Sequence, residues 1–208
     1  MVSWPDFPVV ALVCSAGGLD AVTRVLRSLP TGFPATLLVL QHTQPDARSW
    51  LVDILARRTA MPVIQAADGM ALVPGQVVVV PPGRHLLVTG RDTVALIPSG
   101  AAPPSRPSAD LLLTSLALAV GPRAIAVVLT GHGHDGATGA TAIHHFGGLV
   151  IASDEASSTE FEMPQATIQR RAIVDHITPV DDLPALLIKL VGSALPESKV
   201  TPAGDPPT

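Results

Sequence analysis

The chain has 208 residues, of which 47% are hydrophobic and 14% are charged, whereas soluble domains carry about 25% charged residues. A chain of this length buries a core large enough for one α/β domain without disulfides or structural metals. The net charge is −4, and the 13 lysines and arginines form no run longer than a pair, which argues against binding to nucleic acid. Cys14 is the only cysteine, so no disulfide forms within the chain and a reducing compartment is allowed.

Neither export nor membrane insertion is predicted. No basic residue precedes Arg24, whereas a signal peptide begins with positive charge. The apolar run over residues 111–120 contains Thr114 and Ser115 and is shorter than the roughly 18 residues of a membrane helix. We therefore expect a cytoplasmic protein.

Strand and helix patterns alternate from the N-terminus. Residues 9–14 form a continuous apolar run, which is typical of a strand buried on both faces of a sheet. A helix is predicted next, with Asp20 as its cap and Pro30 as its stop. The elements predicted after it are a strand, a helix and a short strand, over residues 35–40, 49–58 and 63–66.

The middle of the chain has a different pattern. Three β-rich pieces lie between residues 77 and 97, separated by Pro-Pro-Gly and Gly-Arg-Asp. These turns are too close together for helical crossovers, so we expect an antiparallel insert or edge. A Pro-rich stretch over residues 98–107 follows.

Alternation resumes in the second half. The pattern predicts helices over residues 109–120, 137–146 and 182–191, a short helix after Met163-Pro164, and strands over residues 125–129, 149–152 and 173–175. The whole chain therefore predicts an α/β fold, a doubly wound, mostly parallel sheet with helices on both faces and a small antiparallel hairpin insert. We divide the chain into an N-terminal lead (1–8), one domain (9–192) and a tail (193–208). The high proline content of the tail predicts that it is disordered.

Three predicted strands end in small or polar clusters that together carry the residue types of acyl-transfer chemistry. Ser15 follows the first strand, His42 follows the second, and Asp135 lies in the glycine-rich segment after the strand at 125–129. The carboxyl ends of parallel strands meet at one edge of the sheet, so these residues are expected to share a cleft. They would serve as nucleophile, general base and orienting carboxylate.

Backbone groups near these residues are candidates for stabilising an oxyanion. Gly17 and Gly18 open a helix whose first N–H groups are free, and glycines after the third strand let another backbone segment come close. The residues expected around this site are Ala16, Gly17, Gly131, His132, Gly133 and Met163.

Each of the three residues also has a purely structural interpretation. Ser15 would cap the first helix, His42 would be a structural histidine at a strand end, and Asp135 would be a turn or cap residue. The G-x-S-x-G motif of hydrolases is not matched, because Val13 stands in place of the first glycine. Cys14, at the end of an apolar strand, is predicted to be a core residue.

The histidines offer a second chemistry. His132-Gly133-His134-Asp135 resembles the start of an H-x-H-x-D-H zinc motif, and further ligands would come from His42, His144 and His145. The spacing is one residue short, and Gly136 stands where a histidine is wanted. We predict no metal and no cofactor, and a metal-dependent hydrolase built on His132, His134 and Asp135 stays open as an alternative.

The sequence from about Val9 to Leu190 resembles the catalytic domain of CheB, the protein-glutamate methylesterase of bacterial chemotaxis. The resemblance is carried by nine short motifs, called landmarks here, that occur in the same order as in that family. The landmarks are Ser15-Ala16-Gly17-Gly18, Gln41-His42, Asp68-Gly69, Leu72-Val73-Pro74-Gly75, Pro82-Gly83-Arg84-His85, Arg106-Pro107-Ser108-Ala109-Asp110, Leu129-Thr130-Gly131, Gly133-His134-Asp135-Gly136-Ala137 and Met163-Pro164.

The resemblance implies a serine esterase triad at Ser15, His42 and Asp135, with backbone amides near Ala16 and His132 at the oxyanion. It also implies the substrate, the γ-methyl ester of glutamate side chains on cytoplasmic helices of chemoreceptors or similar signalling proteins, released as glutamate and methanol. Many members of the family also deamidate receptor glutamines. No metal or organic cofactor is implied.

The sequence departs from the family at the nucleophile and near the oxyanion site. Val13 and Ala16 replace the usual glycine and threonine around Ser15, His132 replaces a methionine, and Glu162 replaces a glycine and brings a charge that would alter substrate choice. A catalytically weak or inactive binding and regulatory module is therefore the alternative function. Well-known members carry an N-terminal receiver domain, for which the strand at Val9 leaves no room, so we expect a stand-alone domain.

Overall fold

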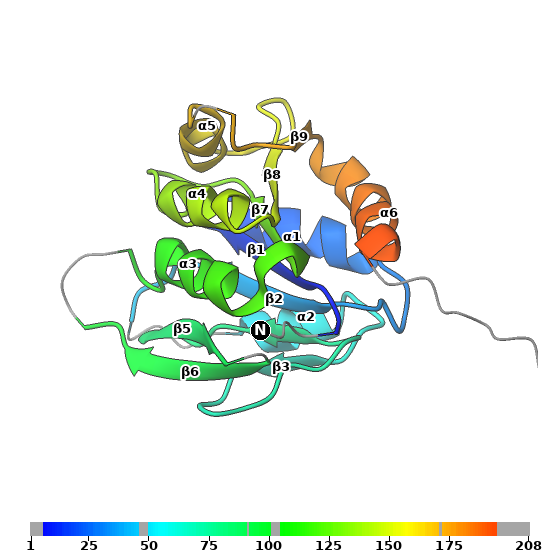
Figure 1. Ribbon diagram of the computed structural model, residues 1–208, viewed down its shortest axis with the longest axis vertical. Helices are drawn as coiled ribbons and strands as arrows, with labels where there is room; N and C mark the ends of the chain where they lie inside the picture. The colour runs from blue at the N-terminus through cyan, green and yellow to red at the C-terminus, as the bar shows by residue number, and fades with distance from the viewer. Residues whose placement is uncertain (1–5, 46–49, 91, 101–104, 171, 195–208) are drawn as a thin grey trace, which may run out of the picture.

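The computed structural model describes residues 6–45, 50–90, 92–100, 105–170 and 172–194. Its centre is a sheet of seven parallel strands in the order β3-β4-β2-β1-β7-β8-β9 (Figure 1), which confirms the predicted α/β class. The strands are β1 (Val9–Cys14), β2 (Thr36–Gln41), β3 (Val63–Gln65), β4 (Val77–Val79), β7 (Ala124–Val128), β8 (Leu149–Ser153) and β9 (His176–Thr178).

Helices cover both faces of this sheet. One face packs against α1 (Gly18–Arg27), α2 (Leu51–Ala56) and α6 (Leu183–Ala194), and the other against α3 (Ala109–Val120), α4 (Ala137–His145) and α5 (Glu162–Ile168) (Figure 1). Alternate residues of β1 enter the two cores, Leu12 on the α1 side and Val13 on the α3 side, and both are fully buried. Burial on both sides explains why β1 is apolar without alternation.

The β-rich middle divides between the main sheet and a hairpin. The first piece, β4, is parallel and lies between β2 and β3, and all three of its valines are buried. Only β5 (Arg84–Thr89) and β6 (Thr93–Pro98) form the antiparallel insert, and β5 packs against α3. The predicted hairpin is therefore confirmed, whereas assigning β4 to the insert was wrong.

Two predicted elements differ from the structure. The helix α1 begins at Gly18 after the left-handed Gly17, so Asp20 lies in its first turn and is not its cap. The strand predicted over residues 173–175 is wrong, because β9 spans His176–Thr178; before it, the Asp175 N–H donates to the Val150 carbonyl (2.9 Å). Residue 49, predicted to start a helix, and most of the predicted tail, from residue 195 onward, lie outside the described residues.

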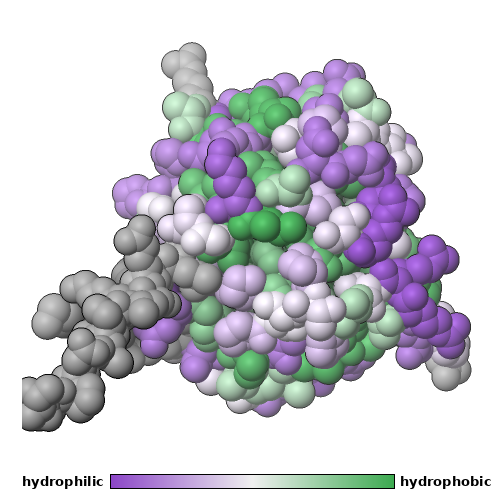
Figure 2. Space-filling view, turned by 90° about the vertical axis from the view of Figure 1, so that its right-hand side faces the viewer, coloured by the Kyte–Doolittle hydropathy of each residue, from purple (hydrophilic) through white to green (hydrophobic). Residues whose placement is uncertain are grey.

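None of the helices in the described part of the chain is both long and apolar enough to cross a membrane. The face shown in Figure 2 has apolar and polar residues interspersed. Ile188 of α6, with 44% of its surface exposed, is one of the large apolar side chains that face solvent.

The strand order reverses at β1. The chain moves from β1 to β2 on one side of it, and later places β7 on the other side. In such sheets the ligand site lies beyond the carboxyl ends of the strands at this reversal. The segments after β1, β2 and β7 are those that carry Ser15, His42 and Asp135.

Candidate active site

Ser15 lies in a tight turn that is tied to the end of β7. Its N–H donates to the Thr130 carbonyl (2.9 Å), and its own carbonyl accepts the Gly18 N–H (3.0 Å). Gly17 has a φ of 77°, and a Cβ there would lie 2.6 Å from Thr159 Cβ, so the turn requires glycine. No side chain caps α1, so the interpretation of Ser15 as a helix cap is wrong.

His42 and Asp135 come together as predicted. The backbone N–H of His42 donates to the Cys14 carbonyl (3.0 Å), which fixes the backbone of His42 beside the end of β1. His42 Nε2 lies 2.8 Å from Asp135 Oδ2, and both side chains are largely buried. Among the described residues, Ser15 Oγ has no hydrogen-bond partner. In apo active sites the hydrogen bond between nucleophile and base is often long or poorly aligned and tightens only when substrate binds.

The Asp135 carboxylate is held by the N-terminus of α3. It accepts the backbone N–H groups of Ala109 (2.6 Å) and Asp110 (2.9 Å) and the Ser108 hydroxyl (3.2 Å). Free amides and the positive end of a helix dipole favour a negative charge at this place. Burial raises the pKa of Asp135, but the hydrogen bonds from His42 and the two amides outweigh burial and leave the pKa below its ordinary value.

An ionised Asp135 fixes the tautomer of His42. A carboxylate only accepts hydrogen bonds, so His42 Nε2 carries the proton and donates it. The other ring nitrogen, Nδ1, is then left as the proton acceptor. The pair is therefore a base whose orientation is set by a fixed negative charge.

A second carboxylate locks α3 and α4 together. Asp110, in the first turn of α3, accepts the N–H groups of Gly136 (2.9 Å) and Gly139 (2.8 Å) at the start of α4. Each helix N-terminus therefore binds a carboxylate that belongs to the other helix or its leading loop. Gly139 lets the helices approach closely, because a Cβ there would lie 2.6 Å from Leu113 Cβ.

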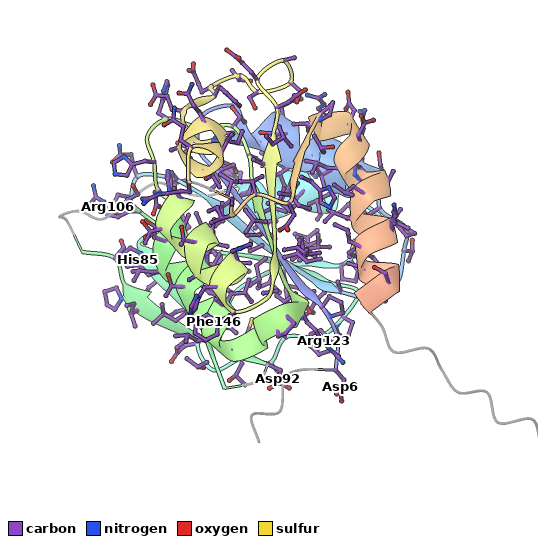
Figure 3. All side chains as sticks on the ribbon, turned by 45° about the horizontal axis from the view of Figure 1, so that its top comes forward. Asp6, His85, Asp92, Arg106, Arg123 and Phe146 are labelled. Carbon is purple, nitrogen blue, oxygen red and sulfur yellow. The ribbon has the colours of Figure 1, made fainter. Side chains whose placement is uncertain are left out.

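His85 supports this arrangement from the hairpin and was not among the predicted site residues. Its Nδ1 accepts the Ser108 N–H (2.9 Å), and only 4% of its surface is exposed. Burial lowers the pKa of His85, which favours the neutral ring that this contact requires. Figure 3 shows His85 and Arg106 at the same end of α3, away from Arg123.

The loop after β7 lies directly against Ser15. A Cβ on Gly131 would lie 2.6 Å from Ser15 Cβ, so only glycine fits between Ser15 and Met163. The Gly131 N–H donates to the Glu160 carbonyl, and its carbonyl accepts the Met163 N–H, both at 2.9 Å. The predicted residues Gly131, His132 and Met163 are thus brought to Ser15 by backbone contacts.

Glu162 reaches back to this loop. Its Oε2 accepts the Gly133 N–H (2.7 Å), and its Oε1 lies 3.4 Å from His132 Nδ1. The Gly133 amide and then His132 hold the pKa of Glu162 below its ordinary value. The Glu162 carboxylate therefore binds the loop after β7. The sequence had suggested only an effect of its charge on substrate choice.

The predicted metal ligands do not converge. His132 faces Glu160 and Glu162, whereas Asp135 is bound to His42, and His145 contacts Phe146 edge-on at the end of α4. Over the described ranges, no three His, Cys, Asp or Glu side chains are grouped as metal ligands. These contacts do not favour the alternative of a metal site at residues 132–135.

Cys14, next to the serine in sequence, is a core residue as predicted. It is fully buried, and burial raises the pKa of its thiol to about 12. Its Sγ donates to the Leu40 carbonyl (3.5 Å). The thiol is therefore neutral and closed to a substrate at neutral pH.

A pocket of about 450 Å³ opens at Ser15 and runs between α1 and α2. Nothing in the sequence pointed to it, because it depends on how the two helices are spaced. The pocket is lined by Ser15, Ala16, Gly17, Leu19, Asp20, Thr23, Gln41, Ile54 and Arg58.

Comparison with known proteins shows which family this chain is related to. Residues 10–187 match the family model described as CheB methylesterase. The chain belongs to the CheB methylesterase family. The CheB methylesterase catalytic domain of Thermotoga maritima has a similar solved structure, with a TM-score of 0.83 and 32% identity, covering 89% of this chain and 99% of that one.

Curated CheB relatives are longer than this chain. Protein-glutamate methylesterase FrzG of Myxococcus xanthus is 39% identical over 90% of this chain and 56% of its own length. A protein-glutamate methylesterase/protein-glutamine glutaminase of Anaeromyxobacter dehalogenans is 40% identical over 88% of this chain and 53% of its own length. The chain thus spans about half the length of these relatives and corresponds to the catalytic domain of the CheB family.

Proposed function

We propose that this chain is a serine esterase that hydrolyses γ-methyl esters of glutamate on cytoplasmic helices of chemoreceptors or related signalling proteins. The observation that carries the proposal is the 2.8 Å contact between His42 Nε2 and Asp135 Oδ2, where the strand order reverses and the His42 backbone is bonded to Cys14, the residue before Ser15. Membership of the CheB family supports the substrate class. The protein would act in the cytoplasm, where such helices lie.

The proposed reaction has two halves. Ser15 Oγ attacks the ester carbonyl while His42 Nδ1 takes its proton, and the backbone amides near Ala16 and His132 donate to the oxyanion. The tetrahedral intermediate collapses, His42 returns the proton to the departing methoxide, and methanol leaves. Water then attacks the acyl-enzyme, with His42 again as the base, and frees glutamate and Ser15. No metal or organic cofactor takes part.

Val13 and Ala16, the two replacements beside the nucleophile that suggested an inactive module, do not disturb the turn that holds Ser15. Val13 is fully buried in the core on the α3 side, one strand residue away from the turn. The carbonyl of Ala16 accepts the Thr130 hydroxyl (2.9 Å), which ties the turn down without the usual threonine side chain. Neither replacement therefore displaces Ser15 from its turn.

Glutamine deamidation is a second candidate activity. The Anaeromyxobacter relative is named both a methylesterase and a protein-glutamine glutaminase. The same residues would release ammonia from a glutamine side chain. We expect this reaction to be slower than ester hydrolysis, because an amide has the poorer leaving group.

Methanol release from methylated chemoreceptor membranes tests the main proposal. We expect release that depends on the purified protein, together with loss of the methyl groups from receptor glutamates. A serine-directed phosphonate probe, followed by peptide mass spectrometry, should label Ser15. Receptor binding without methanol release and without labelling of Ser15 would support the binding module instead.

Glu162 is expected to position the oxyanion loop. Glu162→Ala removes the acceptor of the Gly133 N–H, so the amide at His132 is held less well and kcat should fall about tenfold with little change in KM. Glu162→Gln keeps an acceptor oxygen and should retain most of the rate. Steady-state kinetics of the two variants checks this, and equal losses in both would mean that the charge of Glu162 matters more than its hydrogen bond.

A further inference from the structure

We propose that the pocket between α1 and α2 binds the substrate segment next to the ester, and that Arg58 selects a segment with an acidic side chain. The proposal rests on the proposed function, because it assumes that the ester reacts at Ser15. It adds a chemical class of substrate: a peptide that carries a carboxylate beside its glutamyl methyl ester.

The pocket leads away from the nucleophile along the groove between two helices. Its lining includes Ser15 and Gly17, Thr23 of α1, and Arg58 just beyond α2. A helix rises 1.5 Å per residue, so Thr23 lies about 8 Å along α1 from Gly18. That length corresponds to about two or three residues of extended peptide, or to somewhat more than one turn of a substrate helix. A peptide with its ester at Ser15 and its next residues in the pocket would meet Arg58, because both residues line the same pocket.

The walls suit the aliphatic part of such a segment. Leu19 and Ile54 are partly exposed and line the pocket from the two helices. Thr23 and Gln41 add hydroxyl and amide groups. A volume of about 450 Å³ is within the usual range of ligand pockets and accommodates a few side chains.

The two charged residues that line the pocket differ in whether they form an ion pair. Asp20 pairs with Arg24 along α1 (3.5 Å), and Arg24 in turn binds Asp181 (2.7 Å). In the part of the chain that the structure describes, Arg58 forms no ion pair, whereas Asp20, the other charged lining residue, does. A guanidinium presents several donors in one plane and matches a carboxylate. Arg58 is thus the charge of the pocket that is left for a ligand.

Two carboxylates outside the pocket lining carry the reverse charge near the loop after β7. Glu160 and Glu162 flank His132 there, with carboxylate oxygens 3.7 Å and 3.4 Å from His132 Nδ1. These carboxylates would repel an acidic substrate group, whereas Arg58 would attract it. The two charges together would favour one direction of a peptide at the nucleophile.

A set of peptide methyl esters tests the charge preference. Each peptide has one glutamyl methyl ester and a single Glu, Gln or Lys placed two to five residues from it on either side. We expect kcat/KM from methanol release to be about 3- to 5-fold higher for the best Glu peptide than for its Gln counterpart, and the preference to shrink at high salt.

Adjacent arginines provide a matched control. Arg58→Gln should remove the preference for Glu, so that the Glu and Gln peptides are hydrolysed with similar kcat/KM, and Arg58→Glu should favour the Lys peptide. Arg57→Gln should keep the wild-type preference, because Arg57 is exposed but does not line the pocket. Equal losses in the Arg57 and Arg58 variants, or a preference that survives Arg58→Gln, would overturn the proposal.

Binding separates this proposal from the proposed function. Fluorescence anisotropy of labelled peptides measures affinity without turnover, in the wild type and in the Arg57 and Arg58 variants. An Arg58-dependent affinity for acidic peptides without any hydrolysis would refute the esterase and keep the anionic subsite. Ser15-dependent hydrolysis of the Gln peptide with no charge preference would keep the esterase and refute the subsite.

Discussion

Replacing Ser15 by alanine is expected to lower kcat for methyl ester hydrolysis by about 10⁴- to 10⁶-fold, as loss of the nucleophile does in serine hydrolases. The fold should survive, because the contacts that hold the turn are made by the backbone of Ser15. These are its N–H to Thr130 and its carbonyl to Gly18. Methanol release measures the loss, and urea unfolding should give nearly the same free energy for the variant and the wild type.

Cys14 supplies the control for this experiment. Its thiol is buried beside the serine and has a pKa raised to about 12, so it cannot replace the hydroxyl. We expect Cys14→Ala to keep a rate close to that of the wild type and to lose some stability through the small cavity it creates. Activity that survives in Ser15→Ala and disappears in Cys14→Ala would show that the nucleophile has been assigned to the wrong residue.

The positions of Ser15, His42 and Asp135 could be predicted because each follows a strand with a strong pattern. The buried runs of β1, β2 and β7 identify parallel strands, and parallel strands bring their carboxyl ends to one edge. The short strand β4 was misassigned, because three valines between turns fit a hairpin as well as a sheet strand. Local pattern does not distinguish the two, and the neighbouring strands decide.

The groups that hold the site were harder to predict. Ser108 and Asp110 have the pattern of a helix start, but nothing local indicates that α3 would direct its N-terminus at Asp135, 25 residues or more along the chain. His85 is likewise buried against that helix only because the hairpin packs on α3. These contacts are tertiary, so the sequence shows which residues cap helices without showing which charge each helix binds.

Asp135→Asn is expected to lower kcat by about 10⁴-fold, even though asparagine has nearly the same shape. The carboxylate accepts hydrogen bonds from His42, from two α3 amides and from the Ser108 hydroxyl. An asparagine has one acceptor oxygen, so its NH₂ group would face either the helix amides or the ring. If it faces His42, the ring takes the wrong tautomer and Nδ1 no longer accepts the Ser15 proton.

The same substitution should reduce stability in a pH-dependent way. The pKa of Asp135 is lower in the folded than in the unfolded chain, so its ionised form stabilises the fold above the unfolded pKa, and this contribution is lost as pH falls through the folded pKa. We expect Asp135→Asn to cost about 2–3 kcal/mol at pH 7 and less in acid. Urea unfolding of both proteins across that range measures the difference.

Ser108→Ala separates the two effects of Asp135→Asn. It removes the cap of α3 and one hydrogen bond to Asp135 but keeps the charge that sets the tautomer of His42. We expect a stability loss of about 1 kcal/mol and a far smaller loss of kcat than in Asp135→Asn. If the two variants lost rate in proportion to stability, Asp135 would act only as a structural cap. A rate loss confined to Asp135→Asn would assign the carboxylate to the orientation of His42.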